Sequence, residues 1–437
     1  MQSSQSSNSP SRLTDHRLYS PAAVWILRVV IGAVFIVSGF VKSVDPWGTV
    51  LKLDEYFTVW QLDIPHALIV GASFMLGMYE FVCGGLLFLG CYRRSVVWLL
   101  SLMMAFMLPL TLYIAIASPV DDCGCFGDFI ILSNTATFVK NIFICAALVY
   151  LILYNKLTPG LFIPYTQWFI WAILTLYIFA VELYGYNIQP LIDFRPYSIG
   201  TTLLPADEDE GDDEVTTFLY NYTKDGERRS FTIDSLPDST WTFVDRTLTG
   251  GTSLDTDGFT VVDDEGDDIT TEIIDPDTEQ LLVAIPDIST VDISYTYLIN
   301  ELNDFITSRG GSLVALINSD NKGIEWWKDI SMASYPIYRA DPKLLRTLAR
   351  GLATLTYLDR DTIRWKRSLS TVNYTFVTET PSSRLLASLD PDTGYMLKLI
   401  TAPAVIALLI VMALDHSGKL LAWHLARRKR KEKADAR

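Results

Sequence analysis

Cysteine is scarce in this chain and is confined to its first third. Five of the 437 residues are cysteines, and none follows Cys145. Thiol–disulfide exchange requires a thiolate and a disulfide sulfur in contact, so the chain beyond Cys145 cannot carry out dithiol exchange with its own residues. Any such chemistry belongs to the first 145 residues.

Basic residues are also in the minority. The chain holds 35 Lys and Arg against 50 Asp and Glu, for a formal net charge of −15. Nucleic-acid binding needs a basic surface that neutralises phosphates, so this balance argues against nucleic acid as a partner. The acidic excess lies in residues 188–394, which hold 37 acidic and 17 basic residues, while the remainder is mildly basic. We expect an acidic, well-solvated domain attached to a membrane anchor.

Long apolar runs are abundant. Half of the residues are hydrophobic and the mean hydropathy is +0.25, which is typical of a membrane protein. A helix needs about 20 apolar residues to cross a bilayer. Six runs approach this length, at residues 22–44, 66–91, 96–117, 137–154, 166–187 and 395–414. The first lacks a small-residue cleavage site and exceeds the apolar core of a signal peptide, so we expect it to be retained.

The positions of the basic residues predict the orientation in the membrane. Lys and Arg flanks stay cytoplasmic, and the strongest cluster is the Arg-Arg-Lys-Arg-Lys run at 427–431. Alternation then places residues 188–394 and 121–128 outside, and Arg93, Arg94 and the N-terminus inside. In a bacterium the outside is the periplasm, where disulfides persist. We therefore predict a multi-pass protein of the bacterial inner membrane with both termini cytoplasmic.

The predicted domain organisation follows from these runs and charges. Its six parts are a disordered cytoplasmic N-terminus (1–20), a four-helix membrane domain (21–156), a fifth transmembrane helix (157–187), an acidic periplasmic domain (188–394), a sixth transmembrane helix (395–414) and a basic cytoplasmic tail (415–437). Two shorter features are an amphipathic interfacial helix within residues 45–65 and an acidic loop at 207–214.

The acidic domain has an α/β pattern. Strands are expected at 281–285 and 313–317, and a strand and turn at 259–266. Helices are expected at 295–309, 321–330 and 343–351, and a hairpin joins 353–358 to 362–365. Strands that alternate with helices indicate a partly parallel sheet.

The main candidate for chemistry is the short acidic loop at 121–128, which holds Cys123 and Cys125 on either side of Gly124. The pair can be a redox disulfide that is easily reduced because its ring is short. It can also be half of a metal site, although zinc prefers more sulfur or nitrogen ligands than the loop offers. The third interpretation is a structural disulfide or two free thiols that shape the turn. Spacing alone leaves all three open.

Lys140 lies near the outer end of the fourth run, close to this loop. A nearby cation favours the thiolate, so Lys140 can lower a thiol pKa. It can equally pair with Asp121, Asp122 or Asp128. The other cysteines, Cys83, Cys91 and Cys145, are expected to be apolar or reduced bystanders within or beside the helices.

Ionisable residues within the apolar runs are costly and need a partner. Glu80 must be neutral or paired, and by depth its nearest candidate partner is Arg28. Arg28 and Lys42 lie near the two ends of the first run, so both are expected to snorkel toward the membrane surface. A proton-handling role for Glu80 stays open.

Several of these residues resemble the DoxX/MauE superfamily. The similarity covers about residues 20–155 and rests on segment 28–46, on Glu80 with the following Gly84-Gly85, on the Cys123-Gly-Cys-Phe-Gly-Asp loop, and on Lys140-Asn141. The resemblance implies a four-helix membrane bundle and a role linked to disulfide formation. For MauE, the proposed role is processing, transport or maturation of the disulfide-rich β-subunit of methylamine dehydrogenase. Other DoxX-like proteins are associated with quinone-linked sulfur oxidation.

The later part of the chain resembles a longer DoxX variant of the Bacteroidetes type, in which a segment like 193–200 introduces a periplasmic domain. Residues 259–369 resemble a thioredoxin-like fold. A redox-active member would carry Cys-x-x-Cys after the strand at 281–285, where this chain has Pro286-Asp-Ile-Ser-Thr-Val. No proline precedes the strand at Ala353, where thioredoxins keep a cis-proline. The resemblance therefore implies a binding or structural role for this domain.

Together these observations predict that Cys123 and Cys125 relay redox equivalents while Lys140 tunes the thiolate. Glu80 or Arg28 would support a quinone or proton site, and no metal is expected. The acidic domain would hold a periplasmic client protein. The competing prediction is a non-enzymatic membrane scaffold or assembly factor of the cell envelope, and a third is a small-molecule or ion carrier that uses Glu80. Apart from the resemblance, nothing in the sequence indicates methylamine metabolism.

Overall fold

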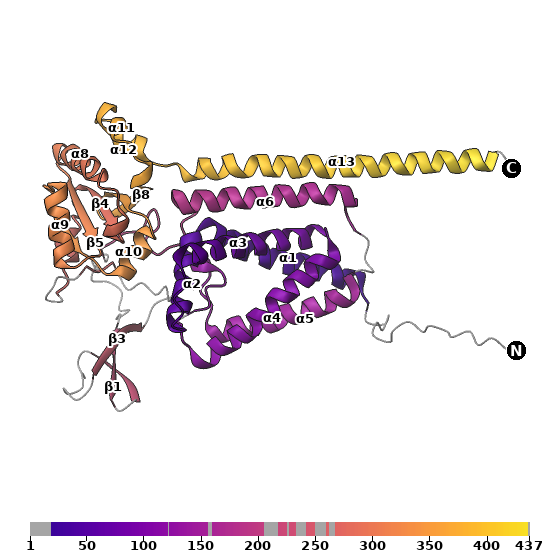
Figure 1. The fold of residues 1–437 in the computed structure, drawn as a ribbon, viewed down its shortest axis with the longest axis horizontal. Helices are drawn as coiled ribbons and strands as arrows, with labels where there is room; N and C mark the ends of the chain where they lie inside the picture. The colour runs from indigo at the N-terminus through magenta and orange to yellow at the C-terminus, as the bar shows by residue number, and fades with distance from the viewer. Residues whose placement is uncertain are drawn as a thin grey trace, which may run out of the picture.

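The computed structural model describes residues 19–120, 122–155, 160–204, 217–224, 227–232, 242–249, 259–261 and 267–435. A helical bundle forms one part, and an α/β domain lies at one end of it (Figure 1). The predicted disordered N-terminus and the acidic loop at 207–214 fall outside the described residues, except for Tyr19 and Ser20.

Six helices in the described residues are long and apolar enough to cross a membrane. They are α1 (Pro21–Val44), α3 (His66–Leu89), α4 (Arg93–Ala117), α5 (Asn134–Tyr154), α6 (Pro164–Asn187) and α13 (Thr393–Asp435). Each of the six predicted runs is confirmed as a helix. Helix α13 is longer than its apolar run, because its 43 residues continue into the basic tail without a break.

Glycines bring α1 and α3 into close contact. A Cβ on Gly39 would overlap the backbone of Phe81, and a Cβ on Gly84 would lie 2.7 Å from the backbone nitrogen of Ile36. Small residues at such positions let helix backbones approach closely and fix their register. Lys42, one turn beyond Gly39, is therefore brought beside Glu80, one residue before Phe81.

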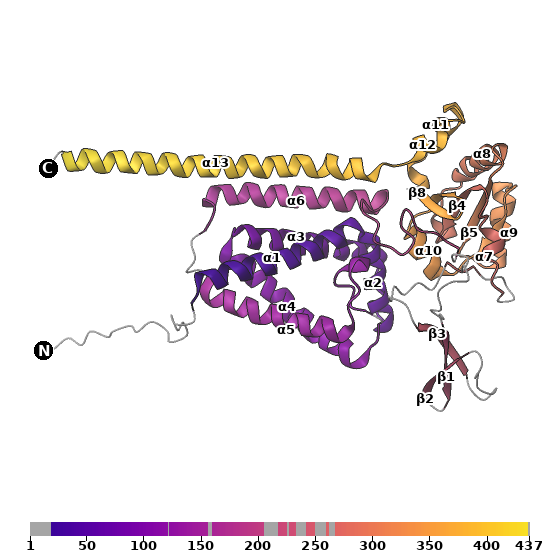
Figure 2. The same ribbon diagram turned by 180° about the vertical axis from the view of Figure 1, so that it is seen from behind.

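Helices α6 and α13 lie side by side along the bundle (Figures 1 and 2). Asp415 of α13 joins them, because its Oδ1 accepts hydrogen bonds from the Ile163 amide at 2.9 Å and from the Thr166 hydroxyl at 2.6 Å. These donors lie at the start of α6, where the first amides of a helix lack intrahelical partners. Asp415 also pairs with Lys419 at 2.6 Å, so its charge is compensated.

A short helix, α2 (Pro46–Val59), lies across the end of the bundle that faces the α/β domain (Figure 1). Asp45 caps it by accepting a hydrogen bond from the Gly48 amide at 3.1 Å, and Pro46 occupies its first turn. The helix expected within residues 45–65 is thus confirmed, and its placement at a membrane interface stays a prediction.

The α/β domain contains a five-stranded mixed sheet. Its strand order is β6 (Ile337–Arg339), β5 (Ser312–Ile317), β4 (Glu279–Ile285), β7 (Thr354–Asp359) and β8 (Thr362–Ser368). Strands β4, β5 and β6 are parallel, whereas β7 and β8 are antiparallel to their neighbours. The expected partly parallel sheet is confirmed, and its thioredoxin-like identity stays a prediction.

Helices cover both faces of this sheet. Alternate residues of a strand face opposite sides, and in β4 Leu281 and Val283 pack toward α8 (Tyr295–Ser308), while Leu282 and Ala284 pack toward α10 (Pro342–Ala349). Burial on both faces accounts for the continuous apolar sequence of this strand. Helix α10 ends beside the membrane bundle, where the next residue, Arg350, pairs with Asp45 and Asp128.

The predictions for this domain are confirmed for most elements. The strands at 281–285 and 313–317, the hairpin and the three helices are all present, with the third predicted helix observed as α10 and the second as α9 (Asn321–Ser331). The strand expected from residue 259 is wrong for the described residues 259–261, which are irregular although Phe259 and Val261 are buried. Their burial in the core explains the apolar pattern without a strand.

Several elements were not predicted. They are the strand β6, the short helices α7 (Thr270–Ile273), α11 (Tyr374–Glu379) and α12 (Leu385–Leu389), and the three-stranded antiparallel sheet of β2 (Glu227–Thr232), β1 (Thr217–Lys224) and β3 (Thr242–Thr249).

Candidate thiol site

The cysteine loop connects α4 to α5 at the end of the bundle near the α/β domain. Gly124 and Gly127 have φ angles of +68° and +51°, a region that favours glycine. The Gly124 amide donates to Asp122 Oδ2 at 2.7 Å, and the Gly127 amide donates to the Gly124 carbonyl at 3.2 Å. These bonds turn the chain so that the side chains of Cys123 and Cys125 meet.

The two sulfur atoms lie 2.6 Å apart, and both cysteines are free thiols. The sulfurs are therefore close enough to form a disulfide, about 2.05 Å long, when an oxidant such as a disulfide removes two electrons and both protons leave. Cys123 is buried and Cys125 is half-buried. Among the residues that the structure describes, no group of three or more His, Cys, Asp and Glu side chains is arranged to hold a metal.

Lys42 of α1 binds the backbone of the cysteine loop. Its ammonium group donates to the Cys125 carbonyl at 2.6 Å and to the Ser38 hydroxyl at 2.8 Å, and pairs with Glu80 Oε2 at 2.7 Å. The Ser38 hydroxyl also donates to the Cys125 carbonyl at 2.6 Å. All three donors of the ammonium are thus used, which satisfies a buried charge.

The expected pairing of Glu80 with Arg28 is wrong. Glu80 pairs with Lys42, because the glycine contacts between α1 and α3 set a register that depth counted from the helix ends does not reveal. The expectation that Lys42 snorkels is wrong for the same reason.

The side chain of Arg28 is fully buried within the bundle, and its expected snorkelling stays a prediction. Its Nε lies 3.4 Å from the Leu87 carbonyl and its guanidinium stacks over Trp25, 4.4 Å from the ring centroid. Within the described part of the chain, its two terminal nitrogens have no hydrogen-bond partner. The structure therefore does not bring Arg28 and Glu80 together as one site.

Lys140 lies over the Phe126 ring at 4.4 Å from its centroid. The expected pairing with Asp122 or Asp128 is not observed, because Asp122 pairs with Lys52 at 2.7 Å and Asp128 pairs with Arg350. Asp121 lies outside the described residues. The other expectation for Lys140, an electrostatic effect on the thiols, agrees with its position beside the loop.

The two thiols have different acidities. A hydrogen bond from Cys123 lowers the pKa of Cys125 to about 7, and the positive charges of Lys140 and Lys42 contribute in the same direction against the effect of burial. The same hydrogen bond, together with burial, raises the pKa of Cys123. Of the two thiols, Cys125 is therefore the one that more readily forms a thiolate, and this thiolate accepts a hydrogen bond from the Cys123 thiol.

Further residues around the loop were missed by the sequence analysis. The Tyr56 hydroxyl of α2 donates to the Cys123 carbonyl at 3.1 Å. Glu182 of α6 is buried and accepts a hydrogen bond from Ser43 at 2.8 Å, one residue after Lys42. A lone acid in the apolar run 166–187 was the available signal for Glu182.

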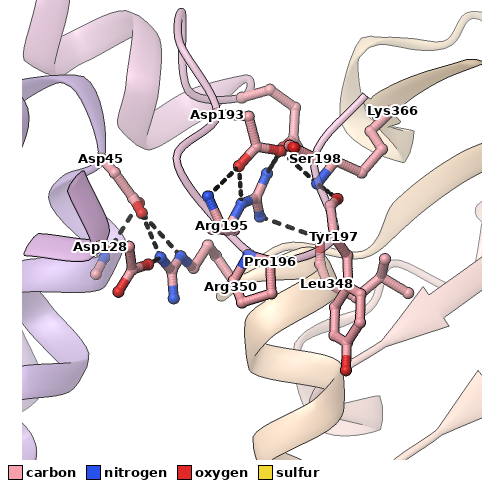
Figure 3. Close-up of polar contacts among 12 residues, drawn as sticks. Asp45, Asp128, Asp193, Arg195, Pro196, Tyr197, Ser198, Leu348, Arg350 and Lys366 are labelled. Carbon is pink, nitrogen blue, oxygen red and sulfur yellow. Dashed lines mark hydrogen bonds and ion pairs between the residues drawn. The ribbon is translucent and has the colours of Figure 1, made fainter. Parts of the chain in front are cut away.

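The α/β domain contacts the cysteine loop through Arg350, just beyond α10 (Figure 3). Its guanidinium binds Asp45 Oδ2 with Nε at 2.8 Å and Nη2 at 2.6 Å, and Nη2 also pairs with Asp128 of the loop. One cation thus joins the end of α1, the cysteine loop and the α/β domain.

A second polar cluster fastens the chain between α6 and the α/β domain (Figure 3). Asp193 accepts hydrogen bonds from Arg195 Nη2 at 2.8 Å and Nε at 2.5 Å, and it pairs with Lys366 of β8. Burial opposes the charge of Asp193, but Arg195 and Lys366 outweigh it and hold the pKa of this carboxyl well below its usual value. Arg195 also donates to the Leu348 carbonyl at 3.0 Å, which ties the segment to the end of α10.

These observations define a multi-pass membrane protein with a polar-anchored cysteine pair at one end of its helical bundle and an α/β domain beside it. Residues 20–154 match the family model described as methylamine utilisation protein MauE, so the chain carries a MauE family domain over α1 to α5. This confirms the family resemblance. Residues 214–249 match a model described as a domain of unknown function (DUF8463), which overlaps β1, β2 and β3.

The comparison with curated proteins finds no match, and neither does the comparison with solved structures. The family match therefore assigns the membrane domain at residues 20–154 to the MauE family. The α/β domain is described from its structure alone.

Proposed function

We propose that this protein is a bacterial inner-membrane protein whose Cys123 and Cys125 exchange disulfides with proteins in the periplasm, and so assist their maturation, processing or disulfide formation. The observation that carries the proposal is the 2.6 Å approach of the two sulfurs together with the lowered pKa of Cys125. A thiolate at neutral pH beside a second thiol is the arrangement that thiol–disulfide exchange requires.

The exchange proceeds in two balanced steps. The Cys125 thiolate attacks a client disulfide, forms a mixed disulfide and releases one client sulfur as a thiolate. Cys123 then loses its proton and attacks the Cys125 sulfur, which releases the second client sulfur and leaves Cys123 and Cys125 bonded. Two electrons pass from the pair to the client, and the reverse sequence oxidises a client dithiol. Cys125 is the attacking group because its thiolate is favoured, and Cys123 is the resolving group.

The α/β domain would bind the client close to the loop. It contains no cysteine, so it takes no part in the exchange itself. Arg350 contacts the loop residue Asp128, so a client bound to this domain would lie close to the pair. The mixed sheet with helices on both faces supports the thioredoxin-like assignment.

The resemblance to DoxX-like proteins implied a possible quinone-binding site, which Glu80 or Arg28 was expected to form. These residues do not fit a joint quinone site, because Glu80 is engaged by Lys42 and Arg28 lies beside Leu87. No quinone step is therefore part of the proposal. Methylamine metabolism is also left out, because no residue outside the family match points to it.

A membrane scaffold or assembly factor is the second candidate. The absence of cysteine from the α/β domain favours it, since a domain of this size that only binds could serve assembly without redox chemistry. On this account Cys123 and Cys125 would only shape the loop.

Trapping separates the two candidates. Cys123→Ser removes the resolving thiol, so a mixed disulfide between Cys125 and a client should accumulate and be visible as a reducible band in cells. Cys125→Ser and the double variant should give no such band. Equal trapping by Cys123→Ser and Cys125→Ser would contradict the assigned roles. No trapping by either, with a partner still retained by the α/β domain, would favour the scaffold.

A further inference from the structure

Arg350 occupies an unusual place for a charged residue. It lies between the α/β domain and the membrane bundle, and only 9% of it is exposed. A buried guanidinium must be paired, and Asp45 and Asp128 provide that pairing. Burial works against its charge, but the two carboxylates outweigh this and raise the pKa of Arg350. The arginine is therefore a fixed cation.

The backbone at this position is also held in place. Arg350 has a φ of +60°, which is uncommon for a residue other than glycine and needs support from its surroundings. Arg195 holds the Leu348 carbonyl two residues earlier. The Trp47 ring of α2 lies against Gly351 and leaves no room for a Cβ there. These contacts hold the backbone of Arg350 in place on the side of the α/β domain that meets α2.

Its two carboxylate partners lie on the two chain segments that form the thiol site. Asp128 is three residues beyond Cys125 in the same loop, and Asp45 is three residues beyond Lys42, which binds the Cys125 carbonyl. Without Arg350, both carboxylates would lose the cation that they share. The loop would then lose its attachment to α10, and two unpaired carboxylates on the segments that bear Cys125 and Lys42 would disfavour the thiolate.

We propose that Arg350 is a positioning residue for the cysteine pair, through which the α/β domain holds the loop in its reactive arrangement. The inference rests on the proposed thiol exchange and deepens it. A movement of α10 is transmitted to Asp128 and from there to Cys125, because the arginine contacts both sides of the junction. The cysteine-free domain would then regulate the pair as well as bind a client.

The test measures the rate of alkylation of Cys125 in the full-length, reduced protein between about pH 5 and pH 9. Iodoacetamide is the probe, and mass spectrometry of the peptide gives the rate. Arg350→Ala should slow alkylation at pH 7 by roughly threefold to tenfold and move the midpoint of the pH profile upward. Arg350→Lys keeps the charge but not the fork of donors, so its alkylation rate should lie between those of wild type and Arg350→Ala.

Arg364→Ala is the matched control. Arg364 pairs with Asp359 in the same domain, and their side chains are 54% and 42% exposed. Replacing Arg364 should therefore leave the pH profile of Cys125 alkylation unchanged. The double variant Asp128→Asn/Arg350→Ala removes one of the bare carboxylates, so it should recover part of the lost rate at pH 7. Recovery of this kind separates electrostatic positioning from simple loss of folding.

The outcomes keep the two proposals apart. An unchanged profile in folded Arg350→Ala, while the wild-type pair still exchanges with a disulfide, overturns the role of Arg350 only. A wild-type pair that never exchanges overturns the proposed function. If Arg350→Ala does not fold, the profile of Arg350→Lys decides, and one equal to wild type overturns the inference.

Discussion

The ammonium group of Lys42 donates a hydrogen bond to the Cys125 carbonyl at 2.6 Å while it pairs with Glu80 at 2.7 Å. A buried ion pair between α1 and α3 therefore supports a loop that lies at the end of the bundle. Glu80 provides the partner that a buried ammonium group needs in that position. The loop geometry thus depends on the packing of two membrane helices.

Removing this ammonium should destabilise the protein strongly. Lys42→Met leaves Glu80 buried without its cation, and breaking a buried pair in this way costs on the order of 3 to 5 kcal/mol. The free energy of unfolding in detergent measures the loss. Lys42→Met/Glu80→Gln should recover much of it, because no unpaired charge remains. Lys52→Met is the control, since its pair with Asp122 is partly exposed and should contribute about 1 kcal/mol or less.

Lys140 should affect acidity more than stability. Its positive charge contributes to the lowered pKa of Cys125, after the hydrogen bond from Cys123. Lys140→Gln should therefore slow alkylation of Cys125 at pH 6 to 7 by roughly twofold to fivefold, with rates that converge above the thiol pKa. Lys322→Gln on the exposed surface of α9 is the matched control. A uniform slowing at every pH would contradict an electrostatic role.

The glycine contacts predict a steric effect. Gly39→Leu places a side chain where the Phe81 backbone lies, so α1 and α3 must separate. We expect a large loss of monodisperse protein in detergent. We also expect a displaced Cys125, because Lys42 would move away from the loop. Gly71→Leu is the control, because nothing lies within 4 Å of a Cβ at that position of α3. Equal behaviour of the two variants would argue against the close packing.

The ion pairs of Asp193 should make the stability of the protein sensitive to acid. Its pKa is lower in the folded protein than in the unfolded chain, so its contribution to stability is complete above about pH 4 and is lost as the pH falls further. Asp193→Asn should lose on the order of 3 kcal/mol at pH 7. The free energy of unfolding of this variant should also fall less than that of wild type when the pH is lowered from about 5 to 2. Tryptophan fluorescence during denaturant unfolding measures both. The same acid sensitivity in wild type and variant would contradict the role of this carboxyl.

The sequence predicts the large elements of this fold because their signals are local. Apolar runs of bilayer length identify all six long helices, and the buried strand 281–285 is recognised from its own residues. The Cys-Gly-Cys spacing likewise identifies the thiol site without any long-range information. In contrast, the partner of Glu80 depends on the register of α1 against α3, which is fixed by the contact of Gly39 with Phe81.

The role of Arg350 could not be predicted for a similar reason. It lies 222 residues after Asp128 and 305 after Asp45, and no local pattern marks it among the other arginines of the acidic domain. The Asp193-Phe-Arg-Pro segment is recognisable in the sequence as the start of this domain, but its contacts with Lys366 and Leu348 require the folded sheet. Long-range pairing of charges is therefore the part that sequence patterns leave out.

The most direct test of this account is the redox state of Cys123 and Cys125 in intact cells, determined by alkylation and mass spectrometry over a titration with external dithiothreitol. Buried Cys83 and Cys91 serve as internal controls that should not change. If the pair exchanges disulfides, it should cycle with a midpoint well above about −300 mV, the potential below which structural disulfides usually lie. A pair that stays fully oxidised, or that never oxidises, would contradict thiol exchange at this site.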